Sequence, residues 1–414
     1  MSNTLTTINL VVRNGEKYIR QCLDSVLAQT YDHSLIELNI LDNDSNDSTR
    51  NIIESYKLEA RSYKLPKFTF TESKVNLGMW PGQEELLKTS NGKYIIGLSV
   101  DIILDPKFVE ESVRVMEQNP KVGMLQAKIF QYELSKLNVG GGKWRERSGE
   151  KEPLFTSHSL PSKIIDTVGF KMFKSREVNN ICHGLSVATS FAQGFGRSKK
   201  AMESKEEIGF DIDKQQEIFA VEGAVSVFRR EAIEQTKITV SKLRSALENK
   251  HMHKTQSIDK GFISVDEKEF CDHEFFWYGD DLDFAWRMRL FGWGQLYAPS
   301  VIAHHDRQTT KSLGGGDAEF VKLRQAIPMF KRRLDYRNYM LTLIKNDYVS
   351  NVFRDLPYIL IRQFKLMVYF FVYEPEIFRE FITIAKLLPR MLLKRREIMC
   401  RVKVSASEIH AWFN

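Results

Sequence analysis

Runs of apolar residues divide the first hundred positions of the chain into strands and helices. The runs at 8–12 and 36–41 are short and continuous, as in strands that are buried on both faces of a sheet. Between them, positions 18–28 have the spacing of apolar residues that is typical of a helix. A second helix is predicted over 49–58, and a further apolar run covers 94–104. The pattern predicts a βαβ unit and an α/β fold.

Short polar side chains follow the first two predicted strands. Asn14 comes after the first strand, and Asp42 and Asn43 end the second. Ligands bind beyond the carboxyl ends of strands in open α/β sheets, so these residues are expected to line one pocket. The chain contains neither a G-x-G-x-x-G fingerprint after the first strand nor a G-x-x-x-x-G-K-[ST] loop. Dinucleotide dehydrogenases and P-loop ATPases are therefore disfavoured.

Asp101 interrupts the apolar run at 94–104. A carboxylate buried in such a run requires a partner or a metal ion, because an unpaired buried charge is strongly unfavourable. The alternative is a carboxylate at a strand end that is exposed to water and requires neither.

A group of three carboxylates, Asp280, Asp281 and Asp283, lies at the start of a helical pattern. Like charges so close together repel each other unless a proton or a cation offsets them. His304 and His305 end a short apolar run about twenty residues further on. A strand that returned them to the carboxylates would create a metal site of oxygen and imidazole ligands. The alternative is an acidic first turn favoured by the helix dipole, with the histidines on a loop.

Taken in order along residues 6–310, these motifs resemble those of the family 2 glycosyltransferases, which are inverting enzymes with the nucleotide-sugar-binding GT-A fold. That family has strands ending in Val-x-x-Tyr-Asn and Val-Asp-Asn, an Asn-Leu-Gly turn, an Asp-x-Asp-type motif before Leu-Asp-Pro, and a Glu-Asp-x-Asp-x-x-x-Arg helix. The counterparts here are Val11-Val12-Arg13-Asn14, Leu41-Asp42-Asn43, Asn76-Leu77-Gly78, Ser99-Val100-Asp101 with Leu104-Asp105-Pro106, and Asp280-Asp281-Leu282-Asp283 with Arg287. Two positions depart from the pattern: Ser99 replaces the first acid of the Asp-x-Asp motif, and Asp280 replaces the glutamate.

The resemblance implies a central mixed sheet flanked by helices, and it assigns roles to the motif residues. Asp101 and His305 would hold a divalent metal, Mg²⁺ or Mn²⁺, which neutralises the leaving diphosphate. Asp281 would be the base that removes the proton of the acceptor hydroxyl, with Asp280 in a supporting role. The nucleotide-sugar-binding residues would be Val12, Asn14, Asp42, Asn43, Asn76, Gly78 and Asp101. Candidates for further contacts with phosphate or acceptor are His304 and Arg307.

Stretches outside the catalytic motifs are similar to bacterial rhamnosyltransferases that extend a lipid-diphosphate-linked sugar. They cover 165–170, 217–224, 228–232, and 388–389 with 394–396. This similarity implies transfer of L-rhamnose from dTDP-L-rhamnose to a lipid-linked saccharide in cell-envelope polysaccharide synthesis. Three alternatives stay open: a glycosyltransferase that uses another UDP- or GDP-sugar, a sugar-1-phosphate nucleotidyltransferase, and a sugar-binding module without catalytic activity.

The region after residue 306 differs from the rest of the chain in charge. Between 307 and 403 there are 20 Lys and Arg residues against 9 Asp and Glu, a net charge of +11, whereas the whole chain carries +7. The apolar segments at 356–361 and 366–373 are too short to span a bilayer, which takes about twenty residues. The region is expected to lie on an anionic membrane surface as a basic amphipathic segment, or to pack on the catalytic domain or on a second copy of the chain. Nucleic-acid binding is disfavoured, because no recognition-helix or zinc-finger signature accompanies the basic residues.

These observations predict a GT-A catalytic domain over 1–306, with a charged insertion at about 241–266, and a basic helical region over 307–414. The four cysteines are widely spread and the amino terminus carries no apolar signal segment. Disulfides and secretion are therefore not expected. The predicted location is the cytoplasm, peripheral on the inner face of the cell membrane.

Overall fold

The computed structural model describes residues 4–60, 67–136, 145–147, 150–152, 163–187, 209–239, 268–307, 321–322 and 324–414. The predicted insertion at 241–266 lies outside these residues. The chain forms two compact units that interleave along the sequence. The sheet unit comprises Met1–Lys171, Val178–Arg230 and Gly294–Ile327, and the helical unit comprises Met172–Glu177, Glu231–Trp293 and Pro328–Asn414.

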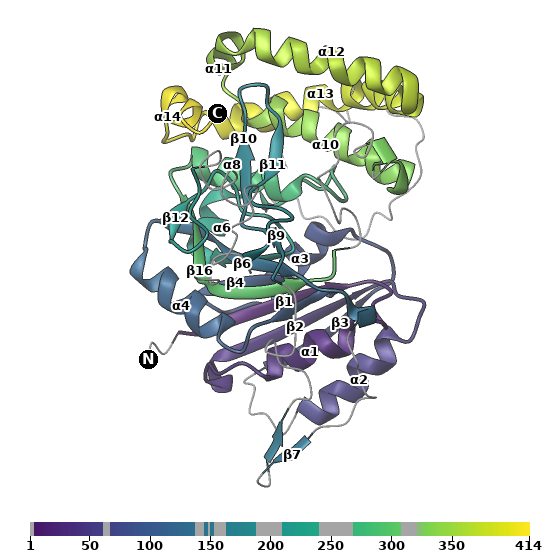
Figure 1. Cartoon of the computed structure of the whole chain (residues 1–414), viewed down its shortest axis with the longest axis vertical. Helices are drawn as coiled ribbons and strands as arrows, with labels where there is room; N and C mark the ends of the chain where they lie inside the picture. Colours follow the sequence, from purple (N-terminus) through teal and green to yellow (C-terminus); the bar gives the residue numbers. More distant parts are fainter. Residues whose placement is uncertain are drawn as a thin grey trace, which may run out of the picture. The chain divides into compact units, whose positions relative to one another are not determined.

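A mixed β-sheet forms the centre of the sheet unit (Figure 1). Its strands are β1 (Thr6–Val12), β2 (Ile36–Asn43), β3 (Lys67–Ser73), β4 (Tyr94–Ser99), β5 (Ile102–Leu104), β6 (Val122–Gln131), β9 (Ile165–Thr167), β12 (Gln216–Glu217), β13 (Val225–Arg229) and β16 (Gly294–His305). The order is β12-β16-β6-β13-β4-β1-β2-β3, with β5 paired to β16 and β9 paired to β6. β1 to β4 are parallel, whereas β13 runs antiparallel to β4 and β6. Short strands outside this sheet are β7 (Arg145–Arg147), β8 (Glu150–Glu152), β10 (Phe170–Met172) and β11 (Val178–Asn180).

Alternating side chains of the strands divide the core of the sheet unit into two layers. Ile8 and Leu10 of β1 belong to the cluster that includes residues of α1 (Ile19–Leu27), α2 (Thr49–Ala60) and α4 (Phe108–Gln118). Val11 faces the other way and packs with Leu41 and with Leu86 of α3 (Met79–Leu87). Helices therefore cover both faces of the sheet, which explains why β1 and β2 are buried along their whole length.

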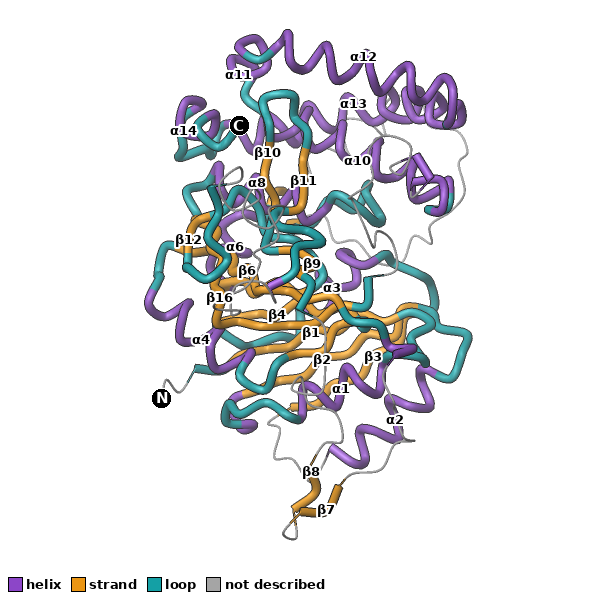
Figure 2. The backbone as a smooth tube through the Cα atoms, viewed as in Figure 1, coloured by secondary structure: helices purple, strands orange, loops and turns teal. Residues whose placement is uncertain are grey.

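The helical unit consists mainly of helices, which Figure 2 shows in purple, and α10 (Met329–Asn346) packs against several of them. Its other elements are α6 (Arg230–Thr236), β14 (Ile238–Thr239), β15 (Lys268–Glu269), α8 (Asp280–Leu290), α11 (Val349–Arg354), α12 (Leu356–Tyr373), α13 (Phe378–Met399) and α14 (Ala406–His410). Leu341 of α10 packs with Phe275, before α8, and with Met391 of α13. Tyr336, also on α10, packs with Phe370 of α12. α10 thus connects the loop before α8 to the C-terminal helices.

The predicted α/β architecture is confirmed: a central mixed sheet is flanked by helices, and the C-terminal region is helical. The helices predicted over 18–28 and 49–58 correspond to α1 and α2. The predicted run at 94–104 is two strands, β4 and β5, which are separated by Val100 and Asp101. The division predicted between 306 and 307 stays a prediction.

Candidate active site

The carboxyl ends of β1, β2 and β4 meet at one edge of the sheet. Val12 is the register partner of Asp42, and Val11 is the partner of Ser99. Asp42 is fully buried, and its Oδ2 accepts a hydrogen bond of 2.5 Å from Nε of Arg50. Its Oδ1 has no hydrogen-bond partner among the described residues. A buried acceptor without a donor is unfavourable, and an N–H group of a bound ligand would relieve it.

Three predicted binding residues of this edge also brace the loops around them. Asn43 accepts a hydrogen bond of 2.8 Å from the backbone of Leu77 and donates one of 2.9 Å to the backbone oxygen of Gly78. It also donates to Oδ1 of Asn76 at 3.1 Å. Asn14, with a φ of 51°, accepts from the backbone of the loop after β2 at 2.9 Å. Gly78 precedes α3 with a φ of 93°, which favours glycine. A role of these residues in nucleotide binding stays a prediction.

Asp101 and His305 lie next to each other, with 3.4 Å between Oδ2 and Nε2. The other ring nitrogen of His305, Nδ1, lies 2.8 Å from Oδ2 of Asp166. Oδ1 of Asp166 in turn accepts a hydrogen bond of 2.7 Å from Arg307, which also donates to Glu222 at 3.1 Å. The five side chains form a continuous network of three carboxylates, one imidazole and one guanidinium.

Charges in this network shift the pKa values of its members. Burial alone would lower the pKa of His305, but Asp101 and Asp166 raise it to about 10. Burial would raise the pKa of Asp166, but the hydrogen bond from His305 and the charge of Arg307 lower it to about 2. The pKa of Asp101 is likewise below its usual value, because His305 outweighs the effect of burial. The two neighbouring carboxylates therefore favour the protonated form of the His305 ring.

The donor set of Asp101 and His305 fits a divalent metal ion. A histidine that binds a metal through one ring nitrogen commonly holds the other against a carboxylate, which fixes the tautomer. Asp166 occupies that position on Nδ1, so Nε2 is directed at Asp101. A cation held by Asp101 Oδ2 and His305 Nε2 would also supply the positive charge that the imidazolium provides here.

His304 is separate from this pair, because successive side chains of a strand point to opposite faces. It is buried, and its ring lies 5.7 Å from that of Phe130. Burial lowers the pKa of His304 to about 4, so its ring is neutral. Its Nδ1 has no hydrogen-bond partner among the described residues. The contact with phosphate or acceptor predicted for His304 stays a prediction.

In the helical unit, Asp280 and Asp281 begin α8. Asp281 is half-buried, and its Oδ1 accepts a hydrogen bond of 2.8 Å from the backbone of Leu282. Asp280 is 1% exposed, and neither of its carboxyl oxygens has a hydrogen-bond partner among the described residues. Burial, and next the charges of Asp281 and Asp283, raise the pKa of Asp280 well above its usual value. The predicted acidic cluster therefore contains one carboxyl group that favours the protonated form.

Buried lysines offset the charge of the neighbouring acids. Lys345 of α10 lies 2.5 Å from Asp272 and 2.8 Å from Asp283, and all three side chains are at most 1% exposed. Lys394 of α13 lies 2.7 Å from the other oxygen of Asp272. Asp283 also pairs with Arg287, four residues further along α8, at 3.4 Å. The helix that carries Asp281 is thus tied to α10 and α13 by buried charge pairs.

The loop that leads into α8 has an unusual backbone. Phe276, Tyr278 and Gly279 all have a positive φ, of 65°, 71° and 78°. The buried side-chain amide of Asn338 donates hydrogen bonds of 2.7–2.8 Å to the backbone oxygens of Trp277 and Tyr278. Non-glycine residues with positive φ persist only where surrounding contacts hold them. Asn338 therefore fixes the start of α8, and with it the position of Asp281.

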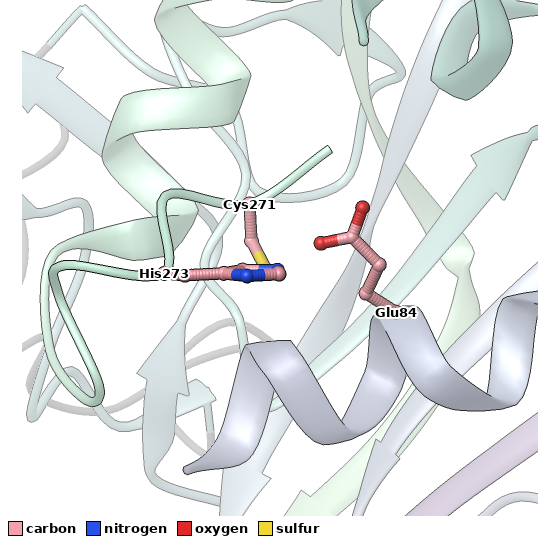
Figure 3. Close-up of side chains that lie close together, drawn as sticks. All are labelled: Glu84, Cys271 and His273. Carbon is pink, nitrogen blue, oxygen red and sulfur yellow. The ribbon is translucent and has the colours of Figure 1, made fainter. Parts of the chain in front are cut away.

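Figure 3 labels Glu84 on α3, and Cys271 and His273 in the loop between β15 and α8. These are ligand types that can hold a metal ion. Glu84 belongs to the sheet unit, and the other two residues belong to the helical unit. No metal role is assigned to this group.

Residues 7–179 match the family model described as Glycosyl transferase family 2. They form a family 2 glycosyltransferase domain. This match and the mixed sheet confirm the predicted family and GT-A fold for the domain. The prediction of a glycosyltransferase is confirmed for this domain, and the activity of the whole protein stays a proposal.

Curated relatives of the glycosyltransferase domain include proteins with and without an assigned substrate. An uncharacterized glycosyltransferase of Methanocaldococcus jannaschii is 27% identical over 131 residues, which are 31% of this chain and 43% of the relative. A poly(ribitol-phosphate) beta-glucosyltransferase of Bacillus spizizenii is 28% identical over 172 residues, which are 41% of this chain and 25% of the relative. The chain spans less than half the length of these relatives. Among solved structures, the mannosyltransferase PcManGT from Pyrobaculum calidifontis, in complex with GDP-Man and Mn²⁺, has a TM-score of 0.44 at 12% identity and covers 96% of this chain and 88% of its own.

Several residues that hold the candidate site residues in place were not identified by the sequence motifs. Asp166 and Glu222 lie in the stretches 165–170 and 217–224, but nothing in the sequence connects them to His305 or Arg307. Lys345 and Asn338 lie in a helical pattern with no motif. Their only sequence signal is a polar residue on the side of a helix that packs inward.

Proposed function

We propose that this protein is an inverting glycosyltransferase that transfers a sugar from a nucleotide diphosphate to a hydroxyl group. The observation that carries the proposal is the Asp101–His305 pair, oriented by Asp166, in a chain with a family 2 glycosyltransferase domain. An acid and an imidazole at the carboxyl edge of the sheet suit a diphosphate and its metal ion.

The donor is bound along the edge of the sheet unit. The free Oδ1 of Asp42 accepts an N–H of the pyrimidine ring. The nucleoside is positioned by Val12, Asn14 and Asn43, and the segment from Asn76 to Gly78 passes the ribose or the diphosphate. Asp101 and His305 would hold a divalent ion, Mg²⁺ or Mn²⁺, whose charge would stabilise the leaving diphosphate.

Asp281 is the general base. It accepts the proton of the acceptor hydroxyl, whose oxygen forms a bond to the anomeric carbon from the face opposite the diphosphate. The bond from the anomeric carbon to the diphosphate oxygen breaks, and its electron pair leaves with the nucleoside diphosphate. Asp280, kept in its protonated form by burial, adds no second negative charge beside the base. Arg307 holds Asp166, and through it the ring of His305.

The best-supported donor is dTDP-L-rhamnose, and the acceptor is a saccharide linked to a lipid diphosphate in cell-envelope synthesis. The support is the similarity of 165–170, 217–224 and 228–232 to rhamnosyltransferases. The similarity to a poly(ribitol-phosphate) beta-glucosyltransferase supports a nucleotide-activated glucose as the alternative donor. A lipid-linked acceptor places the protein in the cytoplasm, at the inner face of the membrane.

Release of nucleoside diphosphate from a panel of nucleotide sugars tests the function. The panel contains dTDP-L-rhamnose, UDP-glucose and GDP-mannose, each with Mg²⁺, with Mn²⁺ and with EDTA. Asp281→Asn should lower turnover by about 10²–10⁴-fold, the usual contribution of a general base. Asp101→Asn should abolish the response to metal. Asp335→Asn, which changes an exposed carboxylate of α10, is the matched control and should behave as wild type.

Turnover that requires both a metal and Asp281 would support the mechanism and identify the sugar. A folded sample that neither binds nor turns over any nucleotide sugar would refute the glycosyltransferase proposal. Binding of a sugar that survives Asp281→Asn and Asp101→Asn, without turnover in any sample, would favour the sugar-binding module instead.

A further inference from the structure

The outward side of α12 is an apolar surface without a partner among the described residues of the helical unit. This α12 face consists of Leu360, Ile361, Phe364, Val368, Phe371 and Val372, all at least 49% exposed. Spacings of three and four residues place these side chains along one side of the helix. Phe364 and Phe371 are 71% and 77% exposed, which is unusual for side chains of this size.

The opposite side of α12 is also apolar, but it is packed. Leu366, Met367 and Phe370 contact the cluster that contains Tyr336 of α10. A helix on the surface of a soluble protein normally has one apolar stripe, which faces the core. α12 has a second stripe facing outward, and large exposed apolar surfaces mark sites of interaction with a protein or a membrane.

Basic side chains dominate the exposed charge of α11, α12 and α13. The exposed bases are Arg354, Lys365, Arg379, Lys386 and Arg396, whereas the exposed acid within 349–399 is Glu376. Three other acids of this segment are buried in ion pairs: Asp355 with Arg176, Glu374 with Arg332, and Glu380 with Arg333. These internal pairs neutralise the three acids, so basic side chains carry most of the exposed charge of α11, α12 and α13. Such a surface complements anionic lipid.

We propose that the α12 face binds an anionic lipid bilayer, with the helix lying in the plane of the membrane. α12 is the one helix of the described residues that is long and apolar enough to cross a membrane, by length and composition only. Its 18 residues extend about 27 Å, less than the hydrocarbon core of about 30 Å. Arg362 and Lys365 lie near its middle, and its inner side is held by α10. These features favour an interfacial helix.

A second copy of the chain is a poorer occupant of the α12 face. In a two-fold contact the same surface meets itself, so the exposed bases would lie opposite each other. At a membrane interface, the aromatic side chains would lie among the acyl chains and the basic side chains would contact the anionic headgroups. The α12 face contains none of the residues of the proposed reaction. Membrane binding rests on the proposed function only in that it would place the enzyme beside a lipid-linked acceptor.

Co-sedimentation of the full chain with lipid vesicles tests the inference. Vesicles of equimolar phosphatidylglycerol and phosphatidylcholine are compared with vesicles of phosphatidylcholine alone. Phe364→Glu should weaken binding to the anionic vesicles by about tenfold or more, because it removes a phenyl group that the bilayer would bury. Lys365→Gln should weaken it by about fivefold, the usual effect of one basic residue near an anionic surface.

Leu58→Glu is the matched control. Leu58 lies on α2 in the sheet unit and is 64% exposed, so the substitution adds the same charge at a similarly exposed apolar position. It should bind vesicles as wild type does. Circular dichroism confirms folding of each variant, and release of nucleoside diphosphate without vesicles is followed in parallel. Failure of the membrane inference and failure of the proposed function are therefore distinguishable.

Binding to anionic vesicles that Phe364→Glu weakens and Leu58→Glu does not would support the inference. Three results would overturn it: no binding by the wild type, equal binding to both vesicle types, or equal loss in the two glutamate variants. A wild-type dimer that Phe364→Glu dissociates, without vesicle binding, would assign the α12 face to a second copy.

Discussion

Asp280→Asn is expected to stabilise the helical unit by an amount that increases with pH. Asp280 is 1% exposed, and neither carboxyl oxygen has a hydrogen-bond partner among the described residues. Burial and the nearby charges of Asp281 and Asp283 raise its pKa in the folded protein well above the usual value, and Lys345 opposes them only in part. Asparagine keeps the size of the side chain and removes its ability to ionise.

The sign of the effect follows from proton binding. An aspartate in the unfolded chain has a pKa of about 3.9. Below that pH both states are protonated, and Asp280 adds no pH dependence to stability. Above it the unfolded chain ionises while the folded protein keeps its proton. The free energy of unfolding therefore falls by about 1.4 kcal/mol for each pH unit, until the pH reaches the pKa of the folded state.

Urea unfolding of wild type and Asp280→Asn at about pH 5, 6 and 7 measures this difference, with EDTA and without donor so that ligand binding does not contribute. Tryptophan fluorescence is a suitable probe, because Trp277, Trp286, Trp293 and Trp412 lie in the helical unit. The advantage of the variant should increase by about 1.4 kcal/mol per pH unit over the window between the two pKa values. Any change in the free energy of unfolding that the new amide itself causes is the same at every pH, so it does not alter this slope.

Asp335→Asn is the control for the slope, because this carboxylate is exposed and lies on α10 of the same unit. It removes a carboxylate from an exposed position of the same helical unit, and the slope for Asp280→Asn is compared with that for this variant. If the stability difference between Asp280→Asn and wild type were independent of pH, Asp280 would be ionised in the folded protein. The assignment of a protonated carboxyl beside the proposed base would then be wrong.

Two further predictions concern buried charges. Lys345→Met removes the lysine that Asp272 and Asp283 share, while Lys394 and Arg287 remain beside them. Breaking a buried ion pair of this kind should lower the free energy of unfolding by about 3–5 kcal/mol; a loss below about 1 kcal/mol in urea unfolding would contradict the buried network. Asp166→Asn removes the carboxylate that orients His305, so the metal concentration for half-maximal turnover should rise by about 10–100-fold. An unchanged metal titration, with Asp335→Asn as the control, would show that Asp166 does not position the ligand.

Several features of the candidate active site were predictable because they depend on short segments. The continuous apolar runs at 8–12 and 36–41 require strands that are covered on both faces, and parallel strands place their carboxyl ends at one edge. Asp42 and Asn43 follow directly on such a strand. Likewise, the spacing of Asp283 and Arg287 produces an ion pair on any helix.

Other features depend on pairs that are far apart in the sequence. Asp166 meets His305 across 139 positions, and Lys345 meets Asp272 across 73. No local pattern encodes these contacts, because each partner alone is an ordinary polar residue of a strand, loop or helix. The units interleave for the same reason: 231–293 belongs with the C-terminal helices although it precedes the last strand of the sheet.

By itself, the sequence determined the fold class, the family of the glycosyltransferase domain and the candidate acids and histidines. Hydrophobic periodicity and motif spacing are local properties, so they are present in the chain before it folds. Only the tertiary structure decided which polar groups are partnered, which carboxyl group favours its proton, and which side of α12 stays exposed. Those properties arise from burial and from contacts between distant segments, which exist only in the folded protein.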